Sequence, residues 1–200
     1  MEKRNYQKEM ETEIVRLEGR KPALLLHSCC GPCSSAVLER LRKHFRVTVL
    51  YYNPNIEPEA EYLHRKAEQE RLLEILGGDI GWLPCEYDHE VFAAFAPGMA
   101  AEPEGGNRCL ACFAMRLNRT AELAKEHGFE YFTTTLSVSP HKNADNVNHA
   151  GEEAARRSGV KYLYADFKKK NGYLRSLQLS AEYGLYRQNY CGCLYSKNPG

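Results

Sequence analysis

The stretch ALLLHSCCGPCSS at residues 23–35 decides the fold of this chain. Its first five residues form a short apolar run of the kind that becomes a buried strand, and Gly31-Pro32 then forces a turn. Cys33 opens an amphipathic helix, and the N-terminus of a helix stabilises thiolate. A buried strand that turns at once into a helix is the first unit of an α/β sheet.

Four further candidate strands follow at residues 47–52, 80–84, 131–136 and 160–164, with helical stretches between them. The clearest helical stretch comes after the Asn-Pro-Asn turn at 53–55 and stops at Gly77-Gly78. Its predicted apolar face consists of Ile56, Ala60, Leu63, Ala67, Leu72, Leu73 and Leu76. Because right-handed crossovers return the chain to the same edge, these strands predict an α/β fold with a doubly wound, mainly parallel five-stranded sheet.

The length and composition are those of one sizeable domain, with 200 residues, 43% hydrophobic and 26% charged. We expect an N-terminal helical extension at 1–20 and a single α/β catalytic domain at 21–200. No stretch approaches the roughly 20 apolar residues of a membrane span, and the charged start lacks the apolar core of a signal peptide. A cytoplasmic protein with no membrane partner is therefore expected.

Doubly wound sheets bind ligands beyond the carboxyl ends of their strands, where the strand order reverses. The first predicted strand runs into the cysteine loop at 27–35, and the fourth runs into Ser-Val-Ser-Pro-His-Lys-Asn at 137–143. Both segments are polar and turn-rich, so we predict the functional site between them. His141 is a candidate proton donor there, or alternatively a helix cap.

Seven of the eight cysteines are clustered, and they lie at 29, 30 and 33, at 109 and 112, and at 191 and 193. In a chain without an export signal, thiols are more often metal ligands or redox groups than structural disulfides. Cys30-Gly-Pro-Cys33 also has the spacing of a thioredoxin-like redox pair, and burial as small core residues is the structural alternative. Cys85, which has no close partner, is expected to be structural.

Cys109-Leu-Ala-Cys112 follows a Gly-Gly-Asn-Arg turn and is predicted to lie at a helix N-terminus. Two cysteine pairs from separate loops provide four thiolates, which suit zinc or an iron–sulfur cluster. A parallel α/β domain of this size needs no structural zinc, so a cluster is favoured. The pair in Cys191-Gly-Cys193 could form a strained, easily reduced disulfide, ligate a metal, or be a surface thiol pair of no consequence.

Charge is distributed unevenly along the chain. Residues 156–200 hold nine Lys or Arg against two acidic residues, a net charge of +7, whereas the remainder carries −6. Seven of the 13 tyrosines also lie in this basic C-terminal segment. Interleaved cations and aromatic rings suit phosphates and unstacked bases, although a solvated basic face is the simpler explanation. The run Lys168, Lys169, Lys170 with Arg175 is a candidate clamp for a nucleic-acid backbone.

Five motifs occur in an order that resembles the QueH family of epoxyqueuosine reductases. They are CCGPC at 29–33, CLAC at 109–112, SVSPHK at 137–142, DFKKKNGY at 166–173 and YGLYRQNYCGC at 183–193. The resemblance extends over about residues 21–195. It implies the last step of queuosine biosynthesis, a cobalamin-independent two-electron deoxygenation of epoxyqueuosine at the tRNA wobble position.

The resemblance also implies roles for individual residues. Cys29, Cys30, Cys109 and Cys112 are implied ligands of a [4Fe–4S] cluster, and Cys191 with Cys193 is an implied redox-active pair. A sheet resembling HUP-like nucleotide-binding and tRNA-thiolating domains is expected, but no Ser-Gly-Gly-x-Asp-Ser loop is present, so ATP use is not expected.

The remaining expectations concern a second metal and the substrate. Cys33, outside the four-ligand set, is a candidate ligand for a second metal ion, iron or zinc. Tyr186 and Tyr190 are candidates for stacking on anticodon bases, and Arg187 and the residues of the clamp are candidates for binding phosphates. The reaction also requires an electron donor, which is unidentified. An iron–sulfur tRNA sulfur transferase and a zinc-stapled RNA-binding module are the alternatives.

Overall fold

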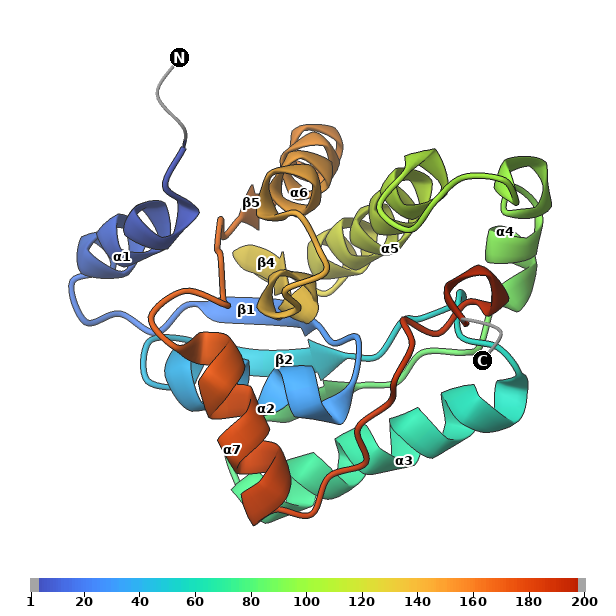
Figure 1. The fold of residues 1–200 in the computed structure, drawn as a ribbon. Coiled ribbons are helices and arrows are strands. Elements are labelled where there is room, and N and C mark those ends of the chain that lie inside the picture. The colour runs from blue at the N-terminus through green and yellow to red at the C-terminus, as the bar shows by residue number, and fades with distance from the viewer. Residues whose placement is uncertain (1–3, 198–200) are drawn as a thin grey trace.

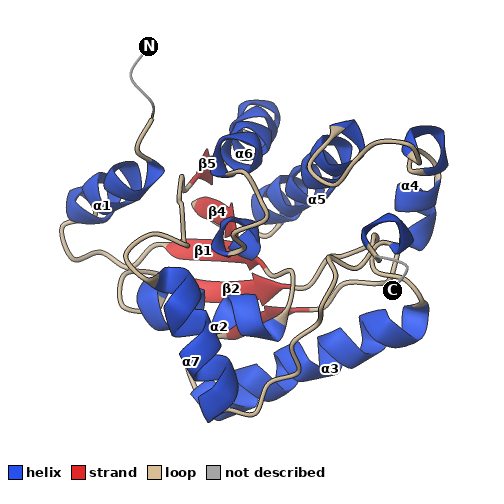
Figure 2. Cartoon of the chain, in the orientation of Figure 1, coloured by secondary structure: helices blue, strands red, loops and turns tan. Residues whose placement is uncertain are grey.

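The computed structural model describes residues 4–197 and contains one sheet of five parallel strands (Figures 1 and 2). The strands are β1 Ala23–His27, β2 Arg46–Leu50, β3 Gly81–Leu83, β4 Tyr131–Thr134 and β5 Lys161–Tyr162. Their spatial order is β3-β2-β1-β4-β5. The order therefore reverses between β1 and β4, which confirms the predicted fold class and the predicted position of the switch point.

Helices cover both faces of the sheet (Figure 1). The helices of the described chain are α1 Tyr6–Arg16, α2 Gly31–Leu41, α3 Glu59–Leu76, α4 His89–Ala93, α5 Asn107–Glu126, α6 Ala144–Ser158 and α7 Gly172–Glu182. Helices α2, α3 and α7 lie on one face, and α5 and α6 pack together on the other. No helix in the described range is long and apolar enough to cross a membrane.

The central strand β1 supplies both halves of the core. Leu24 and Leu26 belong to the apolar cluster on the α2 side, whereas Leu25 belongs to the cluster on the α5 side, and all three are fully buried. This alternation follows from the period of two residues in a strand. Helix α1 adds Met10 to the α2-side cluster and falls within the predicted N-terminal extension.

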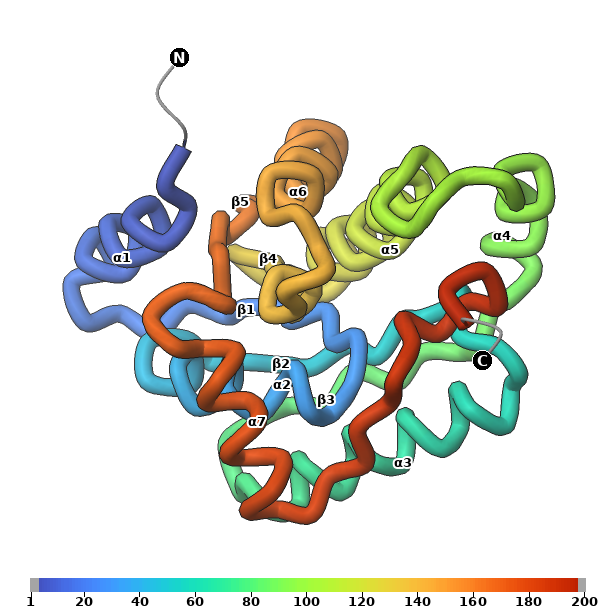
Figure 3. Tube along the Cα trace, in the orientation of Figure 1, coloured from blue at the N-terminus to red at the C-terminus, as the bar shows by residue number. Residues whose placement is uncertain are grey.

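The predicted apolar face of α3 is confirmed only in the C-terminal half, where Leu72 is buried and Leu73 and Leu76 pack against the α2-side cluster. The helix begins at Glu59, not at Ile56, and it buries Tyr62, Arg65, Gln69 and Leu72. Leu63 is 52% exposed, and Ala60 and Ala67 are exposed too. The cause is tertiary, because the C-terminal segment of residues 183–197 lies along α3 (Figure 3) and provides polar partners that a hydrophobic period cannot reveal.

All five predicted strands exist, but only β1 has the predicted bounds, and the other four differ by one or two residues at one end or both. Strand β4 ends at Thr134, and a 3-10 turn at Thr135–Val138 follows. The Thr134 hydroxyl accepts a hydrogen bond from the Leu136 backbone N–H at 3.1 Å, which caps that turn. The turn brings residues 135–138 across the carboxyl end of β1.

Candidate functional site

A buried histidine joins the carboxyl ends of three strands directly beneath the cysteine loop. His27 Nε2 lies 3.0 Å from the Tyr52 carbonyl oxygen, and Nδ1 lies 2.8 Å from Thr134 Oγ1. A carbonyl only accepts, so Nε2 donates and Nδ1 accepts from the Thr134 hydroxyl. Burial, reinforced by the charge of Arg116, lowers the pKa of His27 to about 3. The imidazole is therefore a neutral structural link.

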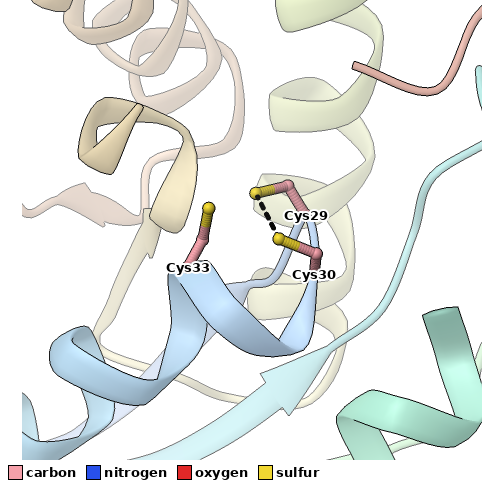
Figure 4. Close-up of side chains that lie close together, drawn as sticks. All are labelled: Cys29, Cys30 and Cys33. Atoms are coloured by element: carbon pink, nitrogen blue, oxygen red, sulfur yellow. Dashed lines mark hydrogen bonds between the residues drawn. The ribbon is translucent and has the colours of Figure 1, made fainter. Parts of the chain in front are cut away.

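Three thiols gather where β1 turns into α2 (Figure 4). The Sγ atoms of Cys29, Cys30 and Cys33 all lie within 4.8 Å of one another, and those of Cys29 and Cys30 are 3.9 Å apart. The helix begins at Gly31-Pro32, so Cys30 takes the N-cap position and Cys33 the first turn. We call these three residues the thiol triad.

The loop that carries the triad is fixed by buried polar contacts. Ser28 Oγ lies 2.6 Å from Ser34 Oγ and donates to Gln69 Oε1 at 2.5 Å. The Asn53 side-chain amide donates to the Ser28 carbonyl oxygen at 2.8 Å. Thr135 Oγ1 donates to Cys29 Sγ at 3.2 Å and accepts from the Cys29 backbone N–H. Strand β1, α3 and the turn after β4 thus all position the triad.

The triad carries its negative charge on one sulfur. Hydrogen bonds from the thiols of Cys30 and Cys33 hold the pKa of Cys29 well below its usual range, with help from the charge of Lys142. The same hydrogen bond to Cys29 raises the pKa of Cys30 to about 12 and also raises the pKa of Cys33. A thiolate at Cys29 is the nucleophilic and metal-binding form of cysteine.

The remaining clustered cysteines form a second group opposite the triad. Cys109 and Cys112 lie in the first two turns of α5, as predicted, and Cys112 packs with Cys193 in one apolar cluster. Burial raises the pKa of both α5 thiols, and the nearby Cys191 raises it further. Cys109 and Cys29 pack against the same apolar cluster of Phe113, Leu136 and Val147, so the two groups adjoin.

Every cysteine has a free thiol, including Cys191 and Cys193. The disulfide considered for this pair is therefore absent. Gly192 between them has φ +131°, a conformation that favours glycine. Cys85 packs against the α5-side core cluster, in keeping with the structural role predicted for it.

Two cations face the sulfurs. Arg116, on α5 one turn after Cys112, is only 1% exposed, and Lys142 is half-buried. Burial lowers the pKa of Lys142, but the nearby sulfurs of Cys191 and Cys29 outweigh that effect and the pKa is raised. His141, in contrast, is exposed. Sequence reasoning missed Arg116, although an arginine on the apolar stripe between Phe113 and Leu117 was a usable signal.

The predicted nucleic-acid clamp is mostly engaged in contacts within the chain. Arg175 pairs with Glu39 at 2.6 Å, Lys168 with Asp166 at 2.8 Å, and Lys170 with Glu11. Lys169 is exposed and forms no ion pair within residues 4–197. The three lysines line a cleft that Lys142 also lines, so this cleft adjoins the thiol site.

The aromatic and guanidinium candidates of the C-terminal segment also have internal partners. The Tyr190 hydroxyl donates to the Glu57 carbonyl oxygen at 2.8 Å, and the Arg65 guanidinium lies 4.8 Å from the Tyr190 ring centroid. Arg187 donates to Ser180 Oγ at 3.1 Å. Tyr186, 37% exposed, donates to the carboxylate of Glu61, and its ring centroid lies 4.4 Å from that of His64.

The triad has the dimensions of a sulfur-ligated metal site. Two thiolates on one tetrahedral metal ion with bonds of about 2.3 Å lie about 3.8 Å apart, close to the 3.9 Å between Cys29 and Cys30. In a four-iron cluster each iron takes one thiolate, so the ligands are spread more widely, and a further ligand from α5 would be required. The adjacent Cys109 and Cys112 could supply it.

A parallel α/β sheet with cysteines gathered in two adjoining groups at its switch point defines a thiol-rich α/β protein with a site that could hold a metal. The sequence model described as "Epoxyqueuosine reductase QueH" matches residues 24–199. The chain therefore belongs to the QueH family.

Curated relatives with the same printed name, Epoxyqueuosine reductase QueH, are similar over most of the chain. The Staphylococcus epidermidis protein is 41% identical, covering 98% of this chain and 85% of the relative. The Streptococcus pyogenes protein is 41% identical over 98% of this chain and 79% of the relative. The Thermotoga maritima protein is 33% identical over 86% of this chain and 89% of the relative.

Proposed function

We propose that this protein is an epoxyqueuosine reductase that acts on tRNA. The observation that carries the proposal is the thiol triad at the switch point of the sheet in a chain of the QueH family. The reaction breaks both C–O bonds of the epoxide, forms a C=C bond, and releases the oxygen as water, which consumes two electrons and two protons. An electron donor outside the chain supplies the electrons.

A [4Fe–4S] cluster held by Cys29, Cys30, Cys109 and Cys112 is the proposed cofactor. Cys29 and Cys109 pack against the same apolar cluster, which supports a ligand set drawn from both groups. The sulfurs of Cys29 and Cys30, 3.9 Å apart, would have to separate to bind different irons. Such a cluster supplies single electrons at a potential set by its surroundings. Cys33, with its sulfur in the triad, is the proposed ligand of a second metal ion, iron or zinc.

The chain's own residues then hold and orient the site. The His27 imidazole fixes the strand ends, Thr135 hydrogen-bonds the Cys29 sulfur, and Lys142 adds positive charge beside it. Cys191 and Cys193 remain the proposed redox-active dithiol, and His141 the proposed proton donor. The exposure of His141 is consistent with proton exchange with solvent, but a substrate must approach its loop for the transfer.

The anticodon loop of the tRNA is proposed to bind at the cleft lined by Lys142 and the three lysines at 168–170. The further proposed contacts are Tyr186, Tyr190, Arg175 and Arg187. Because phosphate contacts release counterions, affinity should fall as salt rises. A triple Lys→Ala variant at 168–170 should weaken tRNA binding and reduce the salt dependence. Unchanged affinity would remove the clamp from the proposal.

The decisive experiment is anaerobic. The purified protein is first analysed for iron, sulfide and zinc. It is then mixed with reductant and tRNA containing epoxyqueuosine, the tRNA is digested, and the masses of the nucleosides are measured by mass spectrometry. Loss of one oxygen from the nucleoside establishes the reductase. The reductase reaction is run without ATP, and a parallel sample contains ATP and a sulfur donor. A nucleoside that gains sulfur in the parallel sample indicates a sulfur transferase, and an unchanged nucleoside in both samples, with zinc and no sulfide, leaves an RNA-binding module.

A further inference from the structure

Arg116 is a buried cation without an acidic partner. Its side chain is 1% exposed, and its guanidinium donates from Nε to the Cys112 carbonyl oxygen at 3.4 Å and from Nη1 to Asn53 Oδ1 at 3.3 Å. The buried Nη2 atom has no hydrogen-bond partner. No carboxylate within residues 4–197 lies within ion-pair distance of it.

The two other fully buried arginines have more acceptors than Arg116, although Arg108 Nε also lacks a hydrogen-bond partner. Arg65 pairs with Glu61 at 2.6 Å. Arg108 donates from Nη1 to three backbone carbonyl oxygens, the shortest at 2.6 Å. A guanidinium stays protonated in a protein, so burial of Arg116 without an anion carries a large desolvation cost. An anion that offsets this cost is expected nearby.

The groups that face Arg116 come from four parts of the chain. They are Cys112 and Cys109 on α5, Cys29 after β1, Cys191 in the C-terminal segment, neutral His27, and the cation Lys142. Lys142 repels Arg116, and His27 carries no charge. Among these groups, only the sulfurs can carry a negative charge.

We propose that Arg116 is the buried counter-charge of the anionic sulfur centre, with Nη2 as the hydrogen-bond donor reserved for a metal-bound sulfur. This inference rests on the proposed function only in that it requires metal to bind at these cysteines. Arg116 is a positioning residue, because it acts through the sulfur centre and contacts no substrate in this assignment. Its charge should favour metal binding by several thiolates and make the loaded centre easier to reduce.

Three variants separate this role from ordinary packing. Arg116→Met keeps most of the length of the side chain and removes the charge. Arg116→Lys keeps the charge but loses the planar guanidinium group with its several N–H donors. Arg119→Met is the matched control, since Arg119 is an exposed residue on the same helix and its ion pair is with Glu122. All three are compared with the parent chain.

In the first measurement, metal-free, reduced protein is titrated with Co²⁺ alone. Binding is followed by the charge-transfer absorption between thiolate and Co²⁺. Loss of one charged hydrogen bond to a metal-bound sulfur should change the affinity for the metal about tenfold or more. We expect Arg116→Met to bind Co²⁺ about tenfold more weakly, Arg116→Lys to fall between, and Arg119→Met to match the parent. Equal affinity in all four proteins overturns the proposal.

The second measurement is urea unfolding of the same metal-free proteins. Removing an uncompensated charge should leave the unfolding midpoint of Arg116→Met unchanged or higher, although its metal binding is weaker. A lower midpoint with unchanged Co²⁺ affinity would mean that Arg116 is structural, and the proposal would be wrong. If Arg116→Met does not fold, Arg116→Lys alone tests the proposal. The proposal then requires that Arg116→Lys bind Co²⁺ more weakly than the parent chain while its unfolding midpoint is unchanged.

The third measurement applies to protein that contains a cluster. Loss of the Arg116 charge should move the reduction potential to more negative values, and Arg119→Met should not. An unchanged potential in Arg116→Met contradicts the counter-charge role. Failure of the proposed reductase activity leaves the Co²⁺ result standing, so the two proposals fail separately.

Discussion

Arg65 donates a hydrogen bond from Nη1 to the carbonyl oxygen of Cys191, 126 residues further along the chain, at 3.2 Å. The same guanidinium pairs with Glu61 and lies over the Tyr190 ring, and Glu57 N–H donates to the Gly192 carbonyl oxygen at 2.9 Å. A buried arginine on α3 thus holds the Cys191-Gly-Cys193 loop against the thiol site. The hydrophobic period of α3 fails at Arg65 for this reason.

Arg65→Met is expected to loosen that loop. Loss of its charged hydrogen bonds should lower the free energy of unfolding by about 2 kcal/mol and should accelerate alkylation of buried Cys193 by about tenfold. Arg71→Met is the matched control, because Arg71 donates to the carbonyl oxygens of Tyr183 and Gly184 at the far end of the segment. Mass mapping of alkylated Cys193 should show no such acceleration for the control. Equal rates in both variants would mean that Arg65 does not hold the loop.

Gly192→Ala should destabilise the protein more than Gly184→Ala. Both glycines have positive φ, +131° and +58°, but a Cβ at Gly192 would lie 2.8 Å from Ile56 Cγ1, whereas one at Gly184 meets nothing within 4 Å. We expect a loss of about 1 kcal/mol for Gly184→Ala and about 2–3 kcal/mol for Gly192→Ala. Urea unfolding at neutral pH measures both. Indistinguishable midpoints would contradict the close packing of this loop on Ile56.

The neutral His27 makes stability depend on pH. Its pKa is about 3 in the folded protein and about 6.5 in an unfolded chain, so the unfolded state takes up the proton first as the solution is acidified. The stabilisation is therefore complete above about pH 6.5 and is lost as pH falls toward 3, at up to about 1.4 kcal/mol per pH unit. His27→Gln, which cannot take up this proton, should reduce the slope of unfolding free energy between pH 6 and 4 by about that amount. An unaltered slope would show that His27 is protonated in the folded state.

Cys29 should react as a thiolate in the metal-free protein. Because the Cys30 and Cys33 thiols stabilise the Cys29 anion, its alkylation rate should stay nearly constant as pH falls from 9 to 7, unlike that of an ordinary cysteine. Cys33→Ala should raise the Cys29 pKa and slow the reaction at pH 7. Cys85→Ala, which removes a thiol outside the site, should have no effect. A Cys29 rate that drops tenfold per pH unit in the parent chain would refute the shared charge.

The proposed ligand set predicts different metal contents for two single variants. Cys109→Ala should lose the cluster, whereas Cys33→Ala should keep about four irons per chain and lose only the second metal. Iron, sulfide and zinc analysis of anaerobically purified protein measures this, with Cys85→Ala as the control. The opposite result, with iron retained in Cys109→Ala and lost in Cys33→Ala, would assign the triad itself as the ligand set.

Several site features were predictable because they depend on local sequence. The apolar run at 23–27 ends in a Gly-Pro turn, so a strand followed by a helix N-terminus was the expected result, and β1 and α2 confirm it. The Gly-Gly turn before Cys109 likewise placed this residue at the start of α5. The switch point followed from the handedness of the crossovers, a rule that applies to any chain of this pattern.

By itself, the sequence determined the parallel α/β fold, the position of the thiol site at the ends of β1 and β4, and the membership of a family with a distinctive cysteine pattern. Only the tertiary structure decided that the cysteines of α5 adjoin the triad and contact the C-terminal cysteines, and that Arg65 and Arg116 are buried. The physical reason is that hydrophobic period and turn chemistry act over a few neighbouring residues. The charge and hydrogen-bond balance of a buried arginine depends on partners more than 60 residues away, such as Asn53 for Arg116 and Cys191 for Arg65.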